Sequence, residues 1–261
     1  MKRTLITPNL ADYPREYHHL LDGASVYDSS CSPEARVIFI DRNGGYYLKR
    51  APLGTLQKET ELTRYFHSIG LGTEVLSYRS DAYDWLLTAR MRGEDCTHAD
   101  MLARPEWLAD MMGEQLRALH ELPTKGCPIS DHTANYLATV EQNYHTGNYD
   151  TSHFPDSFGY ADAEAAWKTV EQGRHRLKTD TLLHGDYCLP NIMVEDGHFV
   201  GFIDLGNGGV GDRHVDLFWG AWTLNFNLHT DAYRERFFDA YGRDKIELEL
   251  LDIVAACEVF G

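Results

Sequence analysis

The interpretation of this sequence turns on His184-Gly185-Asp186-Tyr187-Cys188-Leu189-Pro190-Asn191, which Asp204-Leu205-Gly206 completes. A predicted hairpin, with strands at 192–194 and 199–203, separates the two parts. Asp186 and Asn191 are five residues apart, so both can point into one cleft from a single loop. Asp204 follows Asn191 by 13 residues, at the end of the hairpin. The sequence therefore predicts three oxygen-bearing side chains at one site.

This set of groups matches the needs of phosphoryl transfer. A carboxylate must accept or orient the proton of the attacking hydroxyl, and oxygen ligands must hold Mg²⁺, because phosphates and metal have to be positioned in line with the nucleophile. The segment supplies both kinds of group and so predicts a phosphotransferase site. The alternative is an ordinary strand-to-turn segment in which Asp186 caps a short helix.

The chain changes character near Gly93. Before it, β-branched and aromatic runs predict strands, and turn residues at 41–45 predict a hairpin with Lys49 on its second strand. After it, apolar residues at helical spacing predict helices. The predicted strands before Gly93 cover 35–40, 46–49, 73–78 and 85–88, with a helix over 55–68. The longest later helix is predicted from about Pro105 to Leu122, with a further short strand at 181–184.

Residues 183–217 resemble the aminoglycoside phosphotransferase family, and within it the 3'-phosphotransferases of kanamycin-type antibiotics. The matching runs are 189–194, 201–206 and 211–213, with Asp216 beyond them. The resemblance implies an α+β, bilobal, protein-kinase-like fold. It implies a β-rich nucleotide-binding lobe over residues 1–93 and a mainly helical catalytic and substrate-binding lobe over 94–261. It also implies transfer of the γ-phosphate of ATP or GTP, with Mg²⁺, to an aminoglycoside hydroxyl, the 3'-hydroxyl being expected.

The resemblance also implies roles for individual residues. Asp186 is the expected catalytic base, and Asn191 and Asp204 are the expected Mg²⁺ ligands. Lys49 is expected to contact the α- and β-phosphates, with Glu59 as its ion-pair partner and Glu61 as the alternative partner. The nucleotide is further expected to meet Ser32, in a phosphate-covering loop, and Met91, in a hinge at 88–93. The expected substrate-binding residues are Asp150, Asp156, Glu258 and Phe260.

The net charge is −16, with 24 basic and 40 acidic residues, which argues against nucleic acid or an anionic membrane as a partner. Residues 1–93 have a net charge of +1, while residues 94–261 have −17. Two segments, 126–167 and 246–261, contain acidic residues but neither Lys nor Arg. Solvated helix faces can have this composition. The resemblance favours a site for a cationic small molecule.

The cysteines and the N-terminus bear on location. Five cysteines are widely scattered, without a CxxC pair, which favours free thiols in a reducing compartment. No apolar run suggests an export signal or a membrane span. A cytoplasmic protein is expected.

Three other interpretations stay open. Residues 206–211 satisfy GxGxxG, the fingerprint of a dinucleotide-binding dehydrogenase, although no alternating strands and helices follow them. The same fold could phosphorylate a macrolide, choline or another cationic metabolite. It could also be a catalytically silent nucleotide-binding module. Asn207 and Trp222 stand where the resembled 3'-phosphotransferases carry Arg, which leaves the substrate less certain than the reaction.

Overall fold

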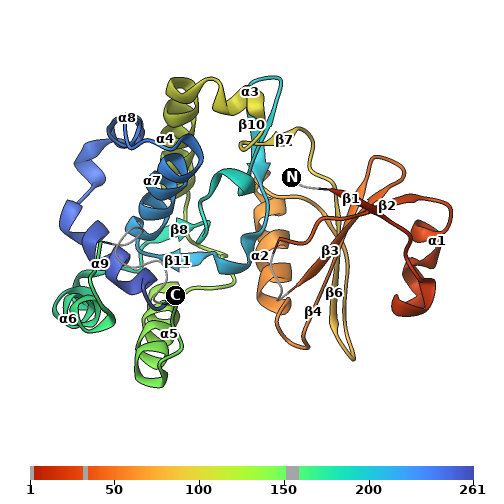
Figure 1. The fold of residues 1–261 in the computed structure, drawn as a ribbon, viewed down its shortest axis with the longest axis horizontal. Coiled ribbons are helices and arrows are strands. Elements are labelled where there is room, and N and C mark those ends of the chain that lie inside the picture. Colours follow the sequence, from red (N-terminus) through yellow and green to blue (C-terminus); the bar gives the residue numbers. More distant parts are fainter. Residues whose placement is uncertain (1–2, 32–34, 151–158) are drawn as a thin grey trace. The chain divides into compact units, whose positions relative to one another are not determined.

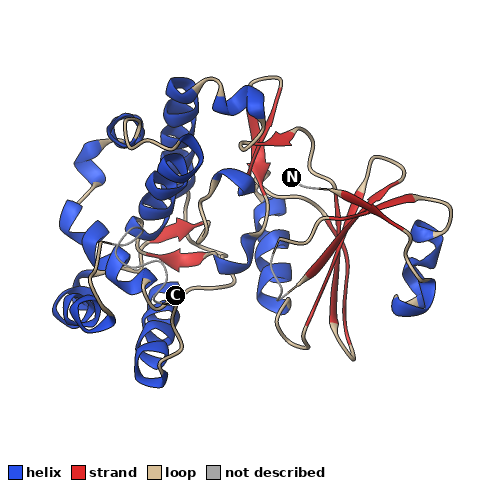
Figure 2. Cartoon of the chain, viewed as in Figure 1, coloured by secondary structure: helices blue, strands red, loops and turns tan. Residues whose placement is uncertain are grey.

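The first predicted hairpin forms the centre of an antiparallel sheet in the computed structural model, which describes residues 3–31, 35–150 and 159–261. The turn between its strands has positive φ at Asn43, Gly44 and Gly45, conformations that suit these residue types. The sheet has six strands in the order β1-β2-β3-β4-β6-β5 (Figures 1 and 2). The strands are β1 (Thr4–Ile6), β2 (Ser25–Asp28), β3 (Arg36–Asp41), β4 (Tyr46–Ala51), β5 (Val75–Ser80) and β6 (Asp84–Ala89).

The two faces of this sheet carry different residues because side chains alternate along each strand. One face is apolar and packs against residues 10–21, which include the short helix α1 (His18–Leu21). Lys49 belongs to the other set of positions on β4 and pairs across the sheet with Val37 on one side and Leu86 on the other. The buried side chains of the apolar face are Val26, Ile38, Ile40, Leu48, Trp85 and Leu87, and those that pack against it are Tyr17, Leu20 and Leu21.

Helix α2 (Gln57–Ser68) follows β4. Leu62 and Phe66 lie one turn apart and are fully buried. The residue that precedes the helix is Leu56, whose backbone N–H donates to the buried carboxylate of Asp84 at 2.9 Å. It stops before Gly70, which has positive φ. The start of α2 is therefore fixed by a charge from strand β6.

The chain divides into two compact units. The first contains the chain to His98 together with Ile192–Gly206, and the second contains Ala99–Asn191 and Asn207–Gly261. The sequence placed one boundary at Gly93 and did not assign 192–206 to the first unit. Residues 192–206 group with the first unit because of a small sheet, in which β9 (Ile192–Glu195) pairs with both β10 (His198–Phe202) and β7 (Glu94–Asp95). A Cβ on Gly93 would lie 2.3 Å from the Val194 carbonyl oxygen, so only glycine allows this approach.

The second unit consists mainly of helices (Figures 1 and 2). Helix α4 packs against α8 and α7, while α9 packs against α6, α7 and α5. A two-stranded antiparallel sheet of β8 and β11 lies beside α4 and α5. The helices are α3 (Ala99–Leu102), α4 (Pro105–His120), α5 (His132–Thr146), α6 (Ala163–Gly173), α7 (His214–Leu228), α8 (Arg234–Tyr241) and α9 (Leu248–Glu258). The two strands are β8 (Thr181–Leu183) and β11 (Gly209–Gly211).

Strand β11 overturns the dinucleotide-binding interpretation. Residues 209–211 of the GxGxxG run pair antiparallel with β8, whereas a dinucleotide fingerprint leads from a parallel strand directly into a helix. A Cβ on Gly209 would lie 2.8 Å from Ile129, and one on Gly211 would lie 2.7 Å from His132. Glycine is needed here because these side chains pack onto the strand.

The expectation of free thiols is confirmed, since all five cysteines are free and three of them are buried. Met111 and Met112 on α4 are buried in the core, whereas Trp107 on the same helix is partly exposed. None of the helices that the structure describes has both the length and the apolar character to cross a membrane.

Candidate active site

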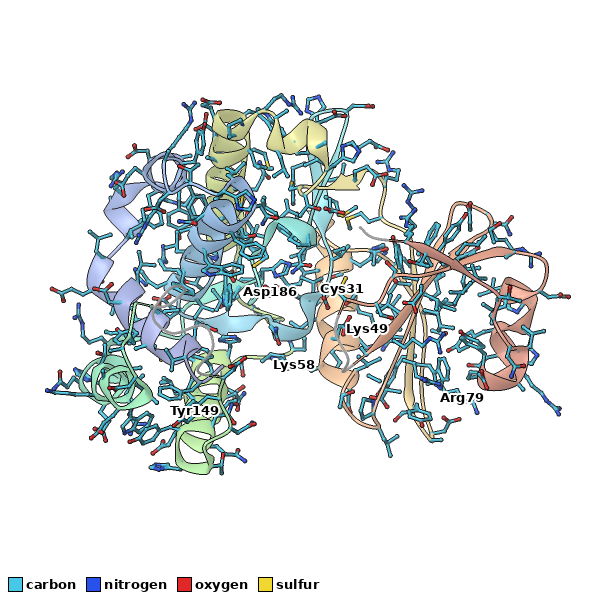
Figure 3. The ribbon with its side chains drawn as sticks, viewed as in Figure 1. Cys31, Lys49, Lys58, Arg79, Tyr149 and Asp186 are labelled. Carbon is cyan, nitrogen blue, oxygen red and sulfur yellow. The ribbon has the colours of Figure 1, made fainter. Side chains whose placement is uncertain are left out.

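Lys49 forms the centre of a charged cluster in the first unit. Its Nζ lies 2.8 Å from Oε2 of Glu59 on α2 and 3.0 Å from Oδ1 of Asp204, which follows β10 (Figure 3). The ion pair expected between Lys49 and Glu59 is therefore present. Glu61 instead accepts a hydrogen bond from the side chain of Gln57 at 3.0 Å. The register of α2 thus selects Glu59 over Glu61.

Lys49 is protonated and carries a positive charge at neutral pH. Burial alone would lower its pKa, but the nearby carboxylates of Glu59 and Asp204 outweigh burial and raise the pKa above the ordinary value. A permanently protonated ammonium group facing two carboxylates can attract the phosphates of a nucleotide. The Glu59 carboxylate fixes the position of the Lys49 ammonium group, because Glu59 is itself held on helix α2.

Asp204 has a backbone conformation that favours function over stability. Its φ is +57°, in the left-handed region, where a non-glycine residue costs on the order of 1–3 kcal/mol. The other positive-φ residues that are not glycine are Asn43, Asp196 and His229, and two of them lie in hairpin turns and one at a helix end. Asp204 lies between β10 and a one-turn 3-10 helix at Leu205–Asn207. Its side chain is about half exposed (53%) and keeps one carboxylate oxygen beyond the bond to Lys49.

Met91 lies in the segment after β6 and is partly buried. A Cβ on Gly201 would lie 2.8 Å from Cε of Met91, so the methyl group rests on the backbone of β10. The segment is anchored at Arg90, whose N–H donates to the Gly45 carbonyl at 3.0 Å. A contact between this segment and a nucleotide base remains a prediction.

The predicted catalytic loop belongs to the second unit. Nδ2 of Asn191 donates to Oδ2 of Asp186 at 2.8 Å and to the Asp186 backbone oxygen at 3.0 Å. The loop thus brings together the two side chains that the spacing predicted. Because the Asn191 nitrogen is used, its amide oxygen is the atom it can offer to a cation. The Asp186 side chain is partly exposed and can reach a ligand.

The Asp216 carboxylate on α7 holds the backbone of this loop through hydrogen bonds. The backbone N–H groups of His184 and Gly185 donate to its two carboxylate oxygens, each at 2.8 Å. Burial alone would raise the pKa of Asp216, but these and other hydrogen bonds hold it below the usual range. Gly185 is required, since a Cβ there would lie 2.0 Å from the Asn207 carbonyl oxygen. His184 accepts the Asp186 N–H on Nδ1 at 3.2 Å and so helps to orient the loop.

A buried polar chain continues from Asp216. Nε2 of His120, on α4, lies 3.1 Å from Oδ2 of Asp216, and Nδ1 lies 2.8 Å from the Tyr241 hydroxyl. Burial lowers the pKa of His120, so the ring is neutral, with Nε2–H donating to Asp216 and Nδ1 accepting from Tyr241. Burial raises the pKa of Tyr241 to about 12, so its hydroxyl keeps its proton. Arg213 donates to the same hydroxyl at 3.4 Å.

Glu258, at the end of α9, is the expected substrate-binding residue whose environment is best defined. The Tyr136 hydroxyl donates to its Oε1 at 2.7 Å. Burial raises the pKa of Glu258 to about 7, the Tyr136 and Trp219 side chains oppose this rise, and the Asp186 carboxylate adds to it. A carboxyl that titrates near neutral pH close to the predicted base is a typical functional group.

The remaining expected substrate residues differ in setting. Phe260 is fully buried, with Tyr149 at 5.3 Å, Tyr144 at 5.5 Å and Trp167 at 6.1 Å between ring centroids. Its observed role is packing, and a contact with substrate stays a prediction. Asp150 is exposed, just after Tyr149 (Figure 3). Ser32 and Asp156 lie outside the described residues.

The two expected metal ligands lie in different compact units, and each carries an oxygen donor of the kind that Mg²⁺ binds. Mg²⁺ prefers oxygen ligands, usually one or two from protein, with water and substrate phosphates completing the shell. Asn191 offers an amide oxygen and Asp204 a carboxylate oxygen. Among the described residues, no cluster of three or more His, Cys, Asp or Glu side chains could hold a metal by itself. A shared metal site formed by these two residues stays a prediction.

A lysine held by a helix carboxylate, and an Asp–Asn loop anchored by a buried aspartate, are features of a kinase-like phosphotransferase. Residues 29–251 match the phosphotransferase enzyme family. The chain is 49% identical over 254 residues to a probable aminoglycoside 3'-phosphotransferase of Lactococcus lactis, covering 97% of each protein. It belongs to the phosphotransferase enzyme family and is an enzyme of that family.

Two solved structures share its bilobal, protein-kinase-like α+β fold. An aminoglycoside 3'-phosphotransferase of type VIII superimposes with a TM-score of 0.78 at 21% identity, covering 96% of each chain. An aminoglycoside phosphotransferase from Streptomyces rimosus, in complex with ADP and streptomycin, gives 0.70 at 21% identity, covering 86% of this chain and 90% of the other. The fold class expected from the sequence is confirmed.

Sequence reasoning missed three residues that shape the site: His120, Tyr136 and Tyr241. Each is far along the chain from its partner, with 96 residues between His120 and Asp216 and 122 between Tyr136 and Glu258. Asp216 was quoted in the resemblance but given no role. The sequence offered one signal for these residues, which is that His120 lies at the end of the amphipathic helix predicted from Pro105 to Leu122.

Proposed function

We propose that the chain transfers the γ-phosphate of ATP or GTP to a hydroxyl of an aminoglycoside, with the 3'-hydroxyl as the acceptor, in the cytoplasm. The reaction type follows from family membership. The single observation that supports the role of the site is the Asp186–Asn191 loop, held by the buried carboxylate of Asp216. This loop presents one carboxylate for a proton and one amide oxygen for a cation.

The residues take the following parts in this proposal. Lys49 binds the α- and β-phosphates and is kept in place by Glu59, with Ser32 and Met91 as further nucleotide contacts. Asp186 accepts the hydrogen bond of the acceptor hydroxyl and orients it for in-line attack. Asn191 and Asp204 hold the metal, and bound Mg²⁺ supplies charge neutralisation at the phosphates. The protein thus acts mostly through positioning and electrostatics.

The substrate class rests on charge and on relatives. The net charge of −17 over residues 94–261 suits a polycation. The Lactococcus relative carries the 3'-phosphotransferase name, and the Streptomyces rimosus structure contains ADP and streptomycin. Glu258 is the best-placed carboxylate for an ammonium group, with Asp150, Asp156 and Phe260 as further substrate contacts.

Replacement of Lys49 by methionine tests the nucleotide half of the proposal. We expect the KM for nucleotide to rise about 10-fold or more, since a close charged contact to phosphate contributes about 1.5–3 kcal/mol. The KM for the acceptor should stay within twofold. Steady-state kinetics with each substrate varied in turn measures both.

The matched control is Arg79→Met. Arg79 lies on the edge strand β5 of the same sheet and makes surface ion pairs with Glu16 and Asp81 (Figure 3). Its loss removes one cation from the first unit without touching Lys49, so nucleotide KM should not change. An unchanged nucleotide KM in the Lys49 variant would contradict the assigned role.

The pH dependence of Glu258 gives a separate prediction. Because its pKa in the folded protein is raised to about 7, above the unfolded value, its contribution to stability is fully present below about pH 4.5 and is lost as pH rises through 7. Glu258→Gln cannot ionise. The Tm of this variant minus the Tm of the wild type should therefore increase from pH 5 to pH 8. A saturating aminoglycoside should make this increase smaller.

The control for this measurement is Glu171→Gln, which removes an exposed acid from α6. Its Tm difference from the wild type should not vary with pH. A Glu258 variant whose Tm difference is equally flat would show that this carboxyl is already ionised in the folded protein at pH 5.

Coupled assays of ADP or GDP release against several aminoglycosides, a macrolide and choline test the substrate class. The proposal expects kcat/KM for at least one aminoglycoside to exceed that for the macrolide and for choline by 100-fold or more. Turnover of choline or the macrolide alone would replace the substrate and keep the reaction. Nucleotide binding without any transfer would indicate a silent binding module.

A further inference from the structure

Helix α7 carries a row of aromatic rings beside the catalytic loop. One face of the helix serves the loop itself, since Asp216 binds its backbone and the Thr223 hydroxyl accepts the Leu189 N–H at 3.2 Å. Trp219, Trp222 and Phe226 follow at spacings of three and four residues, which places them on one adjoining face.

The rings in this row touch one another and are open to solvent at one end. The centroids of Trp219 and Trp222 are 5.3 Å apart, with the rings nearly perpendicular. Trp222 and Phe226 are stacked, with centroids 4.8 Å apart and 12° between the planes. Phe226 is 61% exposed, and both tryptophans are partly exposed. Exposed aromatic surface of this kind is costly in water and commonly marks a binding site.

The row begins at the acidic part of the predicted substrate site. Helix α7 packs against α9, which carries Glu258. The Trp219 side chain is near enough to lower the pKa of Glu258, and the Asp186 carboxylate is near enough to raise it. α7 itself contains no Lys or Arg from His214 to Leu228. A cation bound at Glu258 would therefore meet aromatic rings on this side and no competing positive charge.

We propose that Trp219, Trp222 and Phe226 form a stacking platform for one ring of an amino-sugar acceptor whose ammonium group binds Glu258. The proposal rests on the function proposed above and narrows it to acceptors that present an apolar ring face next to an amine. The C–H face of the sugar packs along the exposed edge of the Trp222–Phe226 stack, and the ammonium group gains a cation–π contact with Trp219. Aromatic stacking at this position makes part of the affinity insensitive to salt.

The test compares three variants with one control. Trp222→Leu, Phe226→Ser and the double variant Trp222→Leu/Phe226→Ser remove the platform at its exposed end. Trp107→Leu is the control, because Trp107 is another partly exposed tryptophan of the second unit, stacked under Arg104 at 4.3 Å. Thermal melts establish that each variant is folded before kinetics are compared.

We expect the double variant to raise the aminoglycoside KM about 10-fold or more, with kcat and nucleotide KM within twofold of wild type. Acceptor binding without nucleotide should quench tryptophan fluorescence in the wild type and in Trp107→Leu, and most of that quenching should be lost in Trp222→Leu. Wild-type turnover combined with an unchanged aminoglycoside KM in the double variant would overturn the platform alone. A wild-type enzyme that phosphorylates no amino sugar would overturn both the platform and the proposed function.

Discussion

Replacement of Asp186 by asparagine is expected to lower kcat for phosphoryl transfer by about 10³-fold. The asparagine keeps the shape of the side chain but cannot accept the proton of the acceptor hydroxyl. Its side chain can still meet Asn191, because an amide oxygen accepts the Nδ2 donation that Asp186 now receives at 2.8 Å. Nucleotide affinity should therefore be kept, and equilibrium binding of a fluorescent ADP analogue alongside steady-state kinetics measures the two effects.

The control for this variant is Asp252→Asn, which neutralises an exposed acid on α9 and leaves the loop unchanged. It should be as active as the wild type. An Asp186→Asn enzyme with kcat within threefold of wild type would remove Asp186 from the catalytic role. Loss of nucleotide binding together with activity would instead point to collapse of the loop.

Asp216→Asn is expected to have the second large effect, on both stability and rate. Asp216 is fully buried and accepts hydrogen bonds from two backbone N–H groups and from His120. An amide offers one oxygen and one N–H₂ group, so at least one of these donors loses its acceptor, at a cost of about 2–3 kcal/mol. Thermal unfolding should show a Tm lower by about 5–10 °C.

The rate effect follows because Asp216 positions the backbone that carries Asp186. We expect kcat to fall about 10²-fold even at temperatures where the variant is fully folded, since small displacements of a reacting group carry costs of this size. His120→Gln should show a smaller loss of both Tm and kcat, because it removes only one donor from Asp216. Wild-type kcat in a folded Asp216 variant would show that the anchor serves stability alone.

The sequence predicted the elements whose signals are local. The Ile38–Phe39–Ile40 run and the turn at Asn43 were enough to place Lys49 on a strand, and helical spacing placed Glu59 one turn into the next helix. The Asp186–Asn191 spacing predicted a pair that the structure confirms at 2.8 Å. These contacts lie within short stretches of chain or between neighbouring elements.

What the sequence did not reveal depends on contacts over long distances. Strand β11 consists of Gly209, Val210 and Gly211, two of which are glycines with little strand preference, and it forms because β8 offers an open edge to pair with. The His120–Asp216 contact joins helices that are 96 residues apart. The grouping of Ile192–Gly206 with the first unit depends on pairing between β7 and β9. Neither propensity nor spacing contains this information.

The most direct test of the account is the product formed by the wild-type enzyme from an aminoglycoside and from its 3'-deoxy analogue, with ATP or GTP and Mg²⁺. Mass spectrometry and phosphorus–proton NMR would identify the phosphate and the carbon that carries it. The account predicts one phosphate on the 3'-oxygen of the parent, none on the 3'-deoxy analogue, and none on either with Asp186→Asn. Phosphate at another position, equal on both compounds, would contradict the 3' assignment, and no phosphorylated aminoglycoside at all would contradict the central claim.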